Sequence, residues 1–379
     1  MSEPMRLLQM CTDFPPGGIQ RHVLDLTSWL RDQGHSVALA GTPGLWMSEA
    51  IDRDFLPLDI QNVTDEGGML LRRFAAAVRA AWKLRGFVRR ERIALIHAHE
   101  GAPALVAWLG MLGRDIPVIV TFHGSEPERV SEFGRIARIA ADLVITPSHN
   151  SARDLREVGG VPAKRLKVIG LGVERKPAPS PDEVARLRQT LLGKEGRQLV
   201  VTVARLAHQK GIDWLVEIVR RAAASDPSLR FVVVGNGPQS ADARRWAKEA
   251  GVEGHLNFAG HSDEAQLYMA AADLFLLPSR WESLPITIVE AFRQGLPVVA
   301  TDTGGVVELV DETVGRVAAV GDIEALTAHV LEITGGEELR SRLSQAARLR
   351  SAEDRFSPPF IHATFAQTYR RVIGGEDAP

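Results

Sequence analysis

Short apolar runs alternate along the whole chain with longer amphipathic segments. The runs in the first half are 5–12, 36–40, 94–97, 117–122 and 143–146, and those in the second half are 199–204, 231–234, 256–259, 273–277 and 297–300. The intervening segments have helical spacing, as where Ile19, Val23, Leu26 and Leu30 fall at steps of 4, 3 and 4. Continuous apolar runs separated by helices are typical of parallel strands buried on both faces. The pattern predicts an α/β fold with two doubly wound Rossmann-like domains.

A proline-rich stretch divides this alternation into two series. Residues 173–181 contain Pro177, Pro179 and Pro181 among polar residues, which indicates a linker. We therefore expect a first domain at 1–172 and a second at 182–355. Residues 356–379 form another amphipathic pattern, expected to be a helix that crosses back to the first domain. Two domains also suit a chain of 379 residues.

Two glutamates surround the joint between a buried run and the next helix. Glu282 follows the apolar run 273–277, and Glu290 lies eight residues later, about two turns into a helix that begins near Pro285. Open α/β sheets bind ligands at the carboxyl ends of their strands, so both carboxylates could face one cleft. Two glutamates alone are more often solvated surface groups, and other residues must decide.

Cations and glycine loops follow several of the other runs. Arg205 and Lys210 lie five residues apart in one strand-to-helix turn, where an Arg fork and a mobile Lys charge suit phosphate oxygens. His123 also follows an apolar run. The glycine loops are Gly17-Gly18, Gly235-Asn236-Gly237-Pro238 and Thr303-Gly304-Gly305, the last opening a helix whose N-terminus could hold an anion. None spells G-x-G-x-x-G, so the nicotinamide fingerprint is absent. Together these loops describe a cleft for a diphosphate joined to hydroxyl-rich groups.

Composition excludes several other classes of protein. The formal net charge of −2 gives no sign of a nucleic-acid binder. Cys11 is the only cysteine, and neither a signal peptide nor a membrane-spanning run is apparent, so we expect a cytoplasmic protein. Asp52-Arg53-Asp54 spells the D-x-D metal signature, but it lies away from any strand's carboxyl end and is interpreted as a solvated helix end. No metal site is expected.

At this point the chain resembles the family-4 retaining glycosyltransferases, which have the GT-B architecture of two Rossmann-like domains facing each other across a cleft. The most specific part is the block 278–308, with its E-x7-E pair and Gly304-Gly305-Val306-Val307-Glu308. The Arg205/Lys210 pair, Gly235, His123-Gly124 and Gly17-Gly18 also match. Asn236 stands where the family usually has an acidic residue.

The resemblance implies a role for each of these positions. It implies that Arg205 and Lys210 bind the donor diphosphate, that Glu290 binds the ribose, and that His123 faces the sugar. Gly17 and Gly18 would let the backbone approach the substrates, in an acceptor-side first domain. The remaining donor contacts implied are Glu282 with the backbone of Ser283, Leu284, Pro285 and Ile286 for the sugar hydroxyls, Gly235 in a close-approach loop, and His261 and Ser262 near the base.

The implied reaction is metal-independent transfer, with retention, of a hexose-type sugar from a nucleoside-diphosphate sugar to a glycan, lipid-linked or small-molecule hydroxyl. No cofactor is expected, and a UDP-sugar is the preferred donor, although the sequence does not separate UDP from GDP or ADP. Two alternatives stay open: a sugar-nucleotide epimerase of the same fold, and a non-catalytic sugar-nucleotide-binding protein. The intact charged positions count against both.

One amphipathic helix, 70–92, bears on location. Leu71, Phe74, Val78, Ala81 and Val88 form an apolar stripe, and Arg72, Arg79, Lys83 and Arg90 form a basic one. The ordinary interpretation is a surface helix that packs its apolar stripe on the first domain and solvates its basic face. The alternative is a peripheral contact with an anionic surface on the inner face of the membrane.

Overall fold

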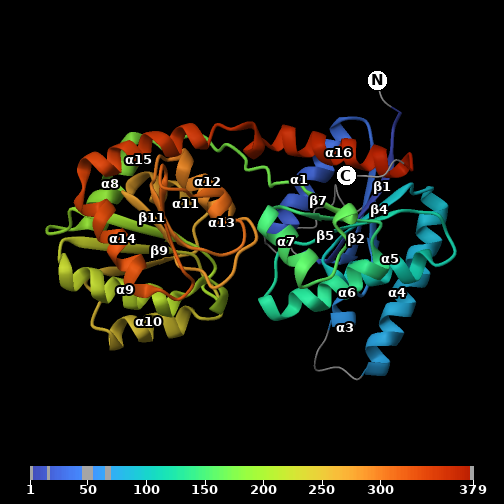
Figure 1. Ribbon diagram of the computed structural model, residues 1–379, viewed down its shortest axis with the longest axis horizontal. Helices are drawn as coiled ribbons and strands as arrows, with labels where there is room; N and C mark the ends of the chain where they lie inside the picture. The colour runs from blue at the N-terminus through green and yellow to red at the C-terminus, as the bar shows by residue number, and fades with distance from the viewer. Residues whose placement is uncertain (1–2, 15–17, 45–53, 65–69, 376–379) are drawn as a thin grey trace. The chain divides into compact units, whose positions relative to one another are not determined.

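The computed structural model describes residues 3–14, 18–44, 54–64 and 70–375. The chain forms two compact units (Figure 1). One comprises residues 1–172 together with 358–379, and the other comprises residues 173–357.

The first unit is built on a seven-stranded parallel sheet with the order β3-β2-β1-β4-β5-β6-β7. Its strands are β1 (Arg6–Asp13), β2 (Ser36–Thr42), β3 (Phe55–Pro57), β4 (Leu95–His99), β5 (Val118–Thr121), β6 (Leu143–Thr146) and β7 (Leu166–Val168). Its helices are α1 (Gly18–Asp32), α3 (Gln61–Thr64), α4 (Leu70–Glu91), α5 (Gly101–Met111), α6 (Val130–Ala140), α7 (His149–Glu157) and α16 (Pro358–Ile373), with short 3-10 turns at Pro127–Arg129 and Ala163–Arg165.

The second unit has a six-stranded parallel sheet with the order β10-β9-β8-β11-β12-β13. Its strands are β8 (Gln198–Val203), β9 (Leu229–Val234), β10 (Leu256–Gly260), β11 (Leu274–Leu277), β12 (Val298–Thr301) and β13 (Gly315–Ala318). Its helices are α8 (Pro181–Leu192), α9 (Ile212–Ser225), α10 (Ser240–Glu249), α11 (Ala265–Ala271), α12 (Ile286–Arg293), α13 (Val306–Leu309), α14 (Ile323–Gly335) and α15 (Glu337–Arg350), with 3-10 turns at His208–Lys210 and Asp354–Phe356.

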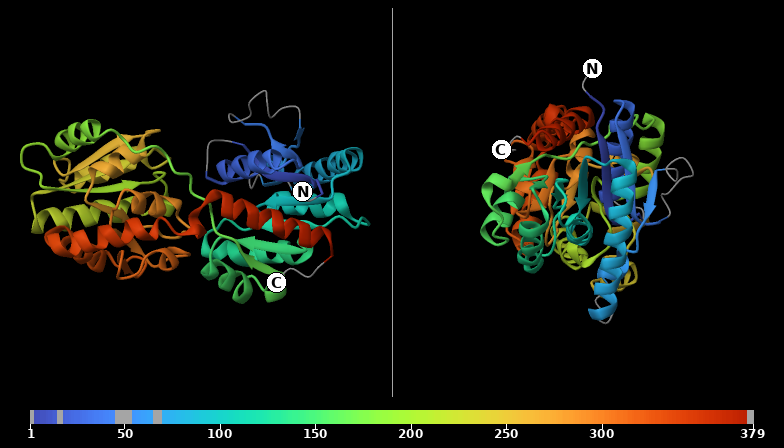
Figure 2. Two further views of the ribbon diagram at one scale, coloured as in Figure 1. Left: turned by 90° about the horizontal axis from the view of Figure 1, so that it is seen from above. Right: turned by 90° about the vertical axis from the view of Figure 1, so that its right-hand side faces the viewer.

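Helices cover both faces of each sheet, which explains the continuous apolar runs. In the first unit, Leu8 of β1 belongs to the core formed with α4 and α5, whereas its neighbour Leu7 belongs to the core formed with α1 and α16. Helix α16 lies beside α1 (Figures 1 and 2). In the second unit, Leu276 of β11 faces the α9 and α14 side and Phe275 the α12 side. This period of two confirms that both faces of the strands are buried.

Each sheet has one point at which the strand order reverses. It lies between β1 and β4 in the first unit and between β8 and β11 in the second. Neighbouring loops diverge to opposite faces there and leave a crevice outside the carboxyl ends of the strands. The loops that follow these four strands are therefore the places to look for ligand-binding residues.

Helix α4 does not bury its whole apolar stripe. Ala81 and Val88 are buried, but the side chains of Leu71, Phe74 and Val78 are 76%, 65% and 44% exposed. The expectation that the full stripe packs on the first domain is therefore wrong for its N-terminal half, and Figure 2 shows this end of α4 extending beyond the rest of the unit. No described helix has both the length and the apolar character needed to cross a bilayer.

Candidate active site

The loops after β8 and β11 flank the switch point of the second unit. Arg205 lies two residues after the end of β8, and Lys210 ends the 3-10 turn that leads into α9. Glu282 lies in the loop between β11 and α12. Arg205 is exposed, and no ion pair joins it to any other residue of the described chain. Its guanidinium is therefore available to an anionic ligand.

Lys210 and Glu282 form a largely buried ion pair. Lys210 Nζ lies 2.5 Å from Glu282 Oε1, and the two side chains are only 17% and 5% exposed. The hydroxyl of buried Ser279 donates a second hydrogen bond to the same carboxylate oxygen, at 2.6 Å. A buried carboxylate needs such partners, since removing one partner of a buried pair costs roughly 3–5 kcal/mol. The structure thus joins two residues to which the family resemblance assigns separate roles.

Arg280 fastens the β11 loop to the start of α9. Its guanidinium donates two hydrogen bonds to the Asp213 carboxylate, at 2.8 and 2.6 Å, and lies 4.0 Å from the ring centroid of Trp214. Gln209 adds a side-chain bond to the Trp281 carbonyl at 3.0 Å. Sequence reasoning missed this support, although opposite charges in two loops already singled out would have indicated it. These contacts fix the loop that carries Glu282 to the segment that carries Lys210.

The Thr303–Gly305 loop packs against the backbone of the Glu282 loop. Gly304 has φ +52°, and a Cβ there would collide with the Glu282 carbonyl oxygen, so only glycine fits. The Gly305 N–H donates to the Ser283 carbonyl at 2.6 Å. This N–H is therefore committed to the protein, and α13 has only four residues. The anion site expected at this loop stays a prediction, to which the Gly305 N–H does not contribute.

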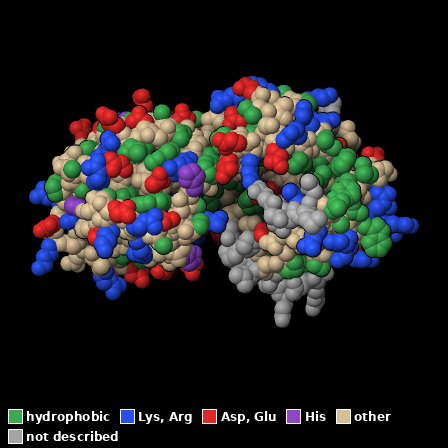
Figure 3. Space-filling model, turned by 90° about the horizontal axis from the view of Figure 1, so that it is seen from below, with side chains coloured by type: hydrophobic (Ala, Val, Ile, Leu, Met, Phe, Trp, Pro, Cys, Tyr) green, Lys and Arg blue, Asp and Glu red, His purple; other side chains and the backbone are tan. Residues whose placement is uncertain are grey.

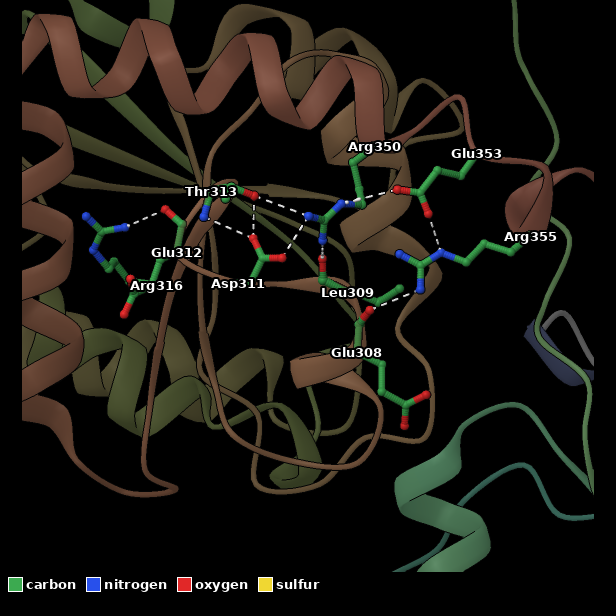
Figure 4. A network of polar contacts seen from close by, with 9 residues as sticks. All are labelled: Glu308, Leu309, Asp311, Glu312, Thr313, Arg316, Arg350, Glu353 and Arg355. Atoms are coloured by element: carbon green, nitrogen blue, oxygen red, sulfur yellow. Dashed lines mark hydrogen bonds and ion pairs between the residues drawn. The ribbon is translucent and has the colours of Figure 1, made fainter.

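Salt bridges anchor the far end of α13, as Figure 4 shows. Arg350 at the end of α15 donates to the Leu309 carbonyl at 3.0 Å and to the Asp311 carboxylate at 2.7 Å. Glu353 accepts from Arg355 at 2.6 Å, and Arg355 also reaches the Glu308 carbonyl. Helix α13 and the glycine loop before it are fixed to α15 by this network.

The segment from Ser283 to Ile286 enters α12. Among the described residues, the N–H groups of Ser283, Leu284 and Ile286 have no hydrogen-bond partner, and Pro285 has no N–H to offer. The buried Ser283 hydroxyl is likewise without a partner in the described chain. Free N–H groups at a helix N-terminus suit oxygen atoms of a ligand.

Glu290 is the fifth residue of α12, about one turn into the helix. It lines a pocket of about 400 Å³ together with Lys176, Gln266 and Arg293. Burial raises the pKa of the Glu290 carboxyl above its ordinary value, while Lys176 and Arg293 oppose the shift. A shielded carboxyl at such a place can accept hydrogen bonds from hydroxyl groups.

Two further donor-side positions follow β9 and β10. Gly235 has φ +140°, and a Cβ there would collide with the Ala204 carbonyl, so the protein itself requires glycine. His261 lies 3.2 Å from Asp263 on the surface, and the Ser262 hydroxyl accepts from the Glu264 N–H at 3.1 Å. All these loops lie at the same edge of the sheet as Arg205, because the strands are parallel.

His123 of the first unit is part of a buried chain of hydrogen bonds. His99 Nε2 lies 2.9 Å from Gln9 Oε1, and His99 Nδ1 lies 2.9 Å from His123 Nε2. An amide oxygen only accepts, so His99 Nε2 carries the proton and His99 Nδ1 accepts from His123 Nε2. Gln9 Nε2 in turn donates to the Tyr369 hydroxyl at 3.1 Å. This chain leaves His123 Nδ1 as an acceptor.

The histidines around His123 stay neutral because they are buried. Burial lowers the pKa of His22 to about 3 and that of His123 and His362 to about 4. It also lowers the pKa of His97 and His99 well below the ordinary range. The tautomer derived for His123 therefore holds at neutral pH.

The switch point of the first unit carries a carboxyl group that sequence reasoning missed. Glu100 follows β4, and the Thr12 hydroxyl at the end of β1 donates to Glu100 Oε2 at 3.1 Å. Burial raises the pKa of Glu100, Thr12 lowers it and Asp13 raises it further. An acidic residue three positions after the apolar run 94–97 would have been the sequence signal.

Two residues singled out from the sequence, Gly17 and Asp52, lie outside the described residues. Gly18 begins α1, and a Cβ there would meet no protein atom within 4 Å. Asp54 forms an exposed ion pair with Arg31 at 3.3 Å. Within the described ranges, no group of three or more His, Cys, Asp or Glu side chains is arranged to hold a metal ion.

Comparisons with known proteins cover both halves of the chain. Residues 16–176 match the model for Glycosyltransferase Family 4, and residues 184–350 match that for Glycosyl transferases group 1. A phosphatidyl-myo-inositol mannosyltransferase of Mycolicibacterium smegmatis is 26% identical over 372 residues, which cover 95% of this chain and 91% of the relative. A glycogen synthase of Mycobacterium tuberculosis is 27% identical over 409 residues, covering 99% and 97%.

Solved structures show the same fold. The crystal structure of HepE from Anabaena in complex with UDP and glucose aligns with a TM-score of 0.80 at 21% sequence identity, covering 97% of this chain and 99% of that one. The two parallel sheets thus correspond to the GT-B architecture. Since the two matching models extend across both units, the chain belongs to the family-4 glycosyltransferases and is a glycosyltransferase of GT-B type.

Proposed function

We propose that the protein transfers a hexose-type sugar from a nucleoside-diphosphate sugar, preferably a UDP-sugar, to a hydroxyl acceptor, with retention of the anomeric configuration and without a metal ion. The observation that carries the proposal is the placement of Arg205 and Lys210 at the switch point of the second unit. Departure of the nucleoside diphosphate develops negative charge on the outer phosphate, and preorganised cations stabilise that charge. Two cations supply there what a divalent ion supplies in other transferases.

The related proteins support the choice of substrates. HepE of Anabaena was crystallised with UDP and with glucose, and the M. smegmatis relative is named for a phosphoinositide acceptor. The free N–H groups at Ser283–Ile286, together with Glu282, are suited to sugar hydroxyls, and Glu290 to those of ribose. The family assignment favours neither an epimerase nor a non-catalytic binding protein.

Release of nucleoside diphosphate tests the donor and the metal requirement together. We expect the purified protein to release UDP from UDP-glucose in the presence of EDTA, faster than GDP from GDP-mannose or ADP from ADP-glucose. Proton NMR of the product should show the anomeric configuration of the donor. Activity that appears only with Mg²⁺ or Mn²⁺ would contradict the metal-independent mechanism, and an inverted product would contradict retention.

We also propose that α4 contacts an anionic membrane surface. The exposed side chains Leu71, Phe74, Val78 and Trp82, the last 77% exposed, follow steps of 3, 4 and 4 and form one apolar row. Arg72, Arg79 and Lys83, also exposed, border this row. Figure 3 views the molecule from the side on which the N-terminal end of α4 lies, and it shows hydrophobic side chains bordered by Lys and Arg on this unit. An apolar row with Trp and a basic border suits the interface of an anionic bilayer, where each cation contributes up to about 1 kcal/mol.

Cosedimentation with vesicles tests this contact. We expect wild-type protein to pellet with phosphatidylserine-containing vesicles at low salt, but neither at high salt nor with pure phosphatidylcholine. An Arg72/Arg79/Lys83/Arg90→Gln variant should stay in the supernatant. Arg220/Arg221/Arg244/Arg245→Gln, with the same charge change on exposed helices of the second unit, should still pellet. Equal sedimentation of the two variants would contradict a specific role for α4.

A further inference from the structure

A pocket of about 370 Å³ opens at the switch point of the first unit. Its polar wall includes Thr12 at the end of β1, together with Glu100 and His123, which follow β4 and β5. Its apolar wall includes Phe122 and Phe133, whose ring centroids lie 4.7 Å apart. The pocket occupies the same topological place in this sheet as the Arg205 and Glu282 loops occupy in the other, where open α/β sheets bind ligands.

Glu100 holds its position in this pocket against a conformational cost. Its φ is +80° and its ψ is 173°, a backbone region that is essentially restricted to glycine. Its N–H is bonded to the Thr121 carbonyl at 3.1 Å, which fixes this conformation. The Glu100 side chain is also partly shielded from water, which a surface turn would not require. A strained backbone that carries a partly buried carboxyl into a pocket is typical of a functional position.

The polar wall of the pocket presents hydrogen-bond acceptors that the protein leaves unused. Thr12 donates to Glu100 Oε2, but Glu100 Oε1 has no partner among the described residues. His123 Nδ1 is likewise an acceptor, because His123 Nε2 donates to His99. Two neighbouring acceptors call for a ligand with several O–H donors. The aromatic wall suits the apolar face of a ring.

We propose that this pocket binds a ring polyol, a sugar or cyclitol, as the acceptor, and that Glu100 accepts a hydrogen bond from one of its hydroxyl groups. The inference rests on the proposed function and names the acceptor class and a residue that recognises it. Glu100 contacts only the acceptor in this scheme. Its loss therefore affects transfer to the acceptor and spares hydrolysis of the donor by water.

Three variants test the proposal. Calorimetry measures the binding of myo-inositol, glucose and mannose to each protein. Transfer kinetics are then measured with the polyol that accepts the sugar. Glu100→Gln should lower kcat/KM for that acceptor about 10- to 100-fold, the effect of losing a hydrogen bond to a charged group. Glu100→Gly should lower it similarly yet raise the melting temperature, because glycine adopts this backbone freely. Glu128→Gln, an exposed carboxylate of the adjacent 3-10 turn, should match wild type in both.

Donor hydrolysis without acceptor separates this inference from the proposed function. If wild type releases no nucleoside diphosphate from any nucleotide sugar, the proposed function fails. If it does, and both Glu100 variants keep the acceptor kcat/KM of wild type, the role of Glu100 is wrong. Failure of wild type to bind any of the three polyols would overturn the ligand class. A lower melting temperature for Glu100→Gly would assign Glu100 a structural role instead.

Discussion

Arg205→Ala and Lys210→Ala should each lower kcat by about two to three powers of ten, but only Lys210→Ala should also destabilise the fold. Each removes a cation that acts on the leaving diphosphate. Arg205 is exposed and unpaired in the described structure, so its loss should change the free energy of unfolding by less than about 0.5 kcal/mol. Lys210 neutralises Glu282, which is only 5% exposed, so its loss should cost roughly 3–5 kcal/mol.

A double variant separates the two effects of Lys210. Lys210→Met/Glu282→Gln removes both charges of the buried pair, so it should recover most of the stability lost in Lys210→Met while staying inactive. Urea unfolding and initial rates on wild type, Lys210→Met, Glu282→Gln and the double variant provide the measurements. Near-normal turnover in both Arg205→Ala and Lys210→Ala would contradict the assignment of the leaving-group site. Full stability of Lys210→Met would contradict the energetic importance of the ion pair.

Glu290→Gln should weaken binding of free UDP about 10- to 100-fold, whereas Glu282→Gln should not weaken it. A hydrogen bond between a carboxylate and ribose hydroxyls contributes about 1.5–3 kcal/mol. Glu282 is paired with Lys210 in the described structure, and its neutralisation leaves the full lysine charge for the diphosphate. Turnover should still fall in Glu282→Gln, because that residue is assigned to the sugar.

Calorimetry with UDP decides between these assignments. Glu249→Gln, which changes an exposed carboxylate at the end of α10, serves as the control and should bind UDP like wild type. Weak UDP binding in Glu282→Gln with normal binding in Glu290→Gln would mean that the two carboxylates have exchanged roles. A loss in both would place both of them at the nucleotide.

The interior of both sheets could be predicted from the sequence because buried parallel strands are continuous apolar runs. Three strands were missed: β3, β7 and β13. Each has three or four residues and lies at the edge of its sheet, where one side of the strand is less covered. The half-buried edge strand β7, Leu166–Val168, contains Lys167 and carries no apolar run. Edge strands are specified by pairing with a neighbour more than by their own composition.

The positions of several candidate-site residues could be predicted from the sequence, but their pairings could not. The positions of Arg205, Lys210 and Glu282 in loops after strands, and of Glu290 in the following helix, follow from local pattern. The ion pair between Lys210 and Glu282 joins residues 72 apart, and no local pattern encodes it. The strained φ of Glu100 is equally invisible, because backbone conformation at a single residue depends on what surrounds it in the folded state. Both features depend on contacts between residues far apart in the sequence, which hydrophobic periodicity does not report.

Helix α16 places the two ends of the described chain in one folded body. Tyr369 bonds Gln9 and His97 across most of the sequence, and the whole second unit is synthesised between them. On a ribosome, the second unit therefore has all its residues before the first unit can acquire its last helix. Contacts of such sequence separation form late, since the intervening chain must be closed into a loop. During synthesis, the face of the first unit that α16 covers therefore stays exposed to water until residues 358–373 have left the ribosome.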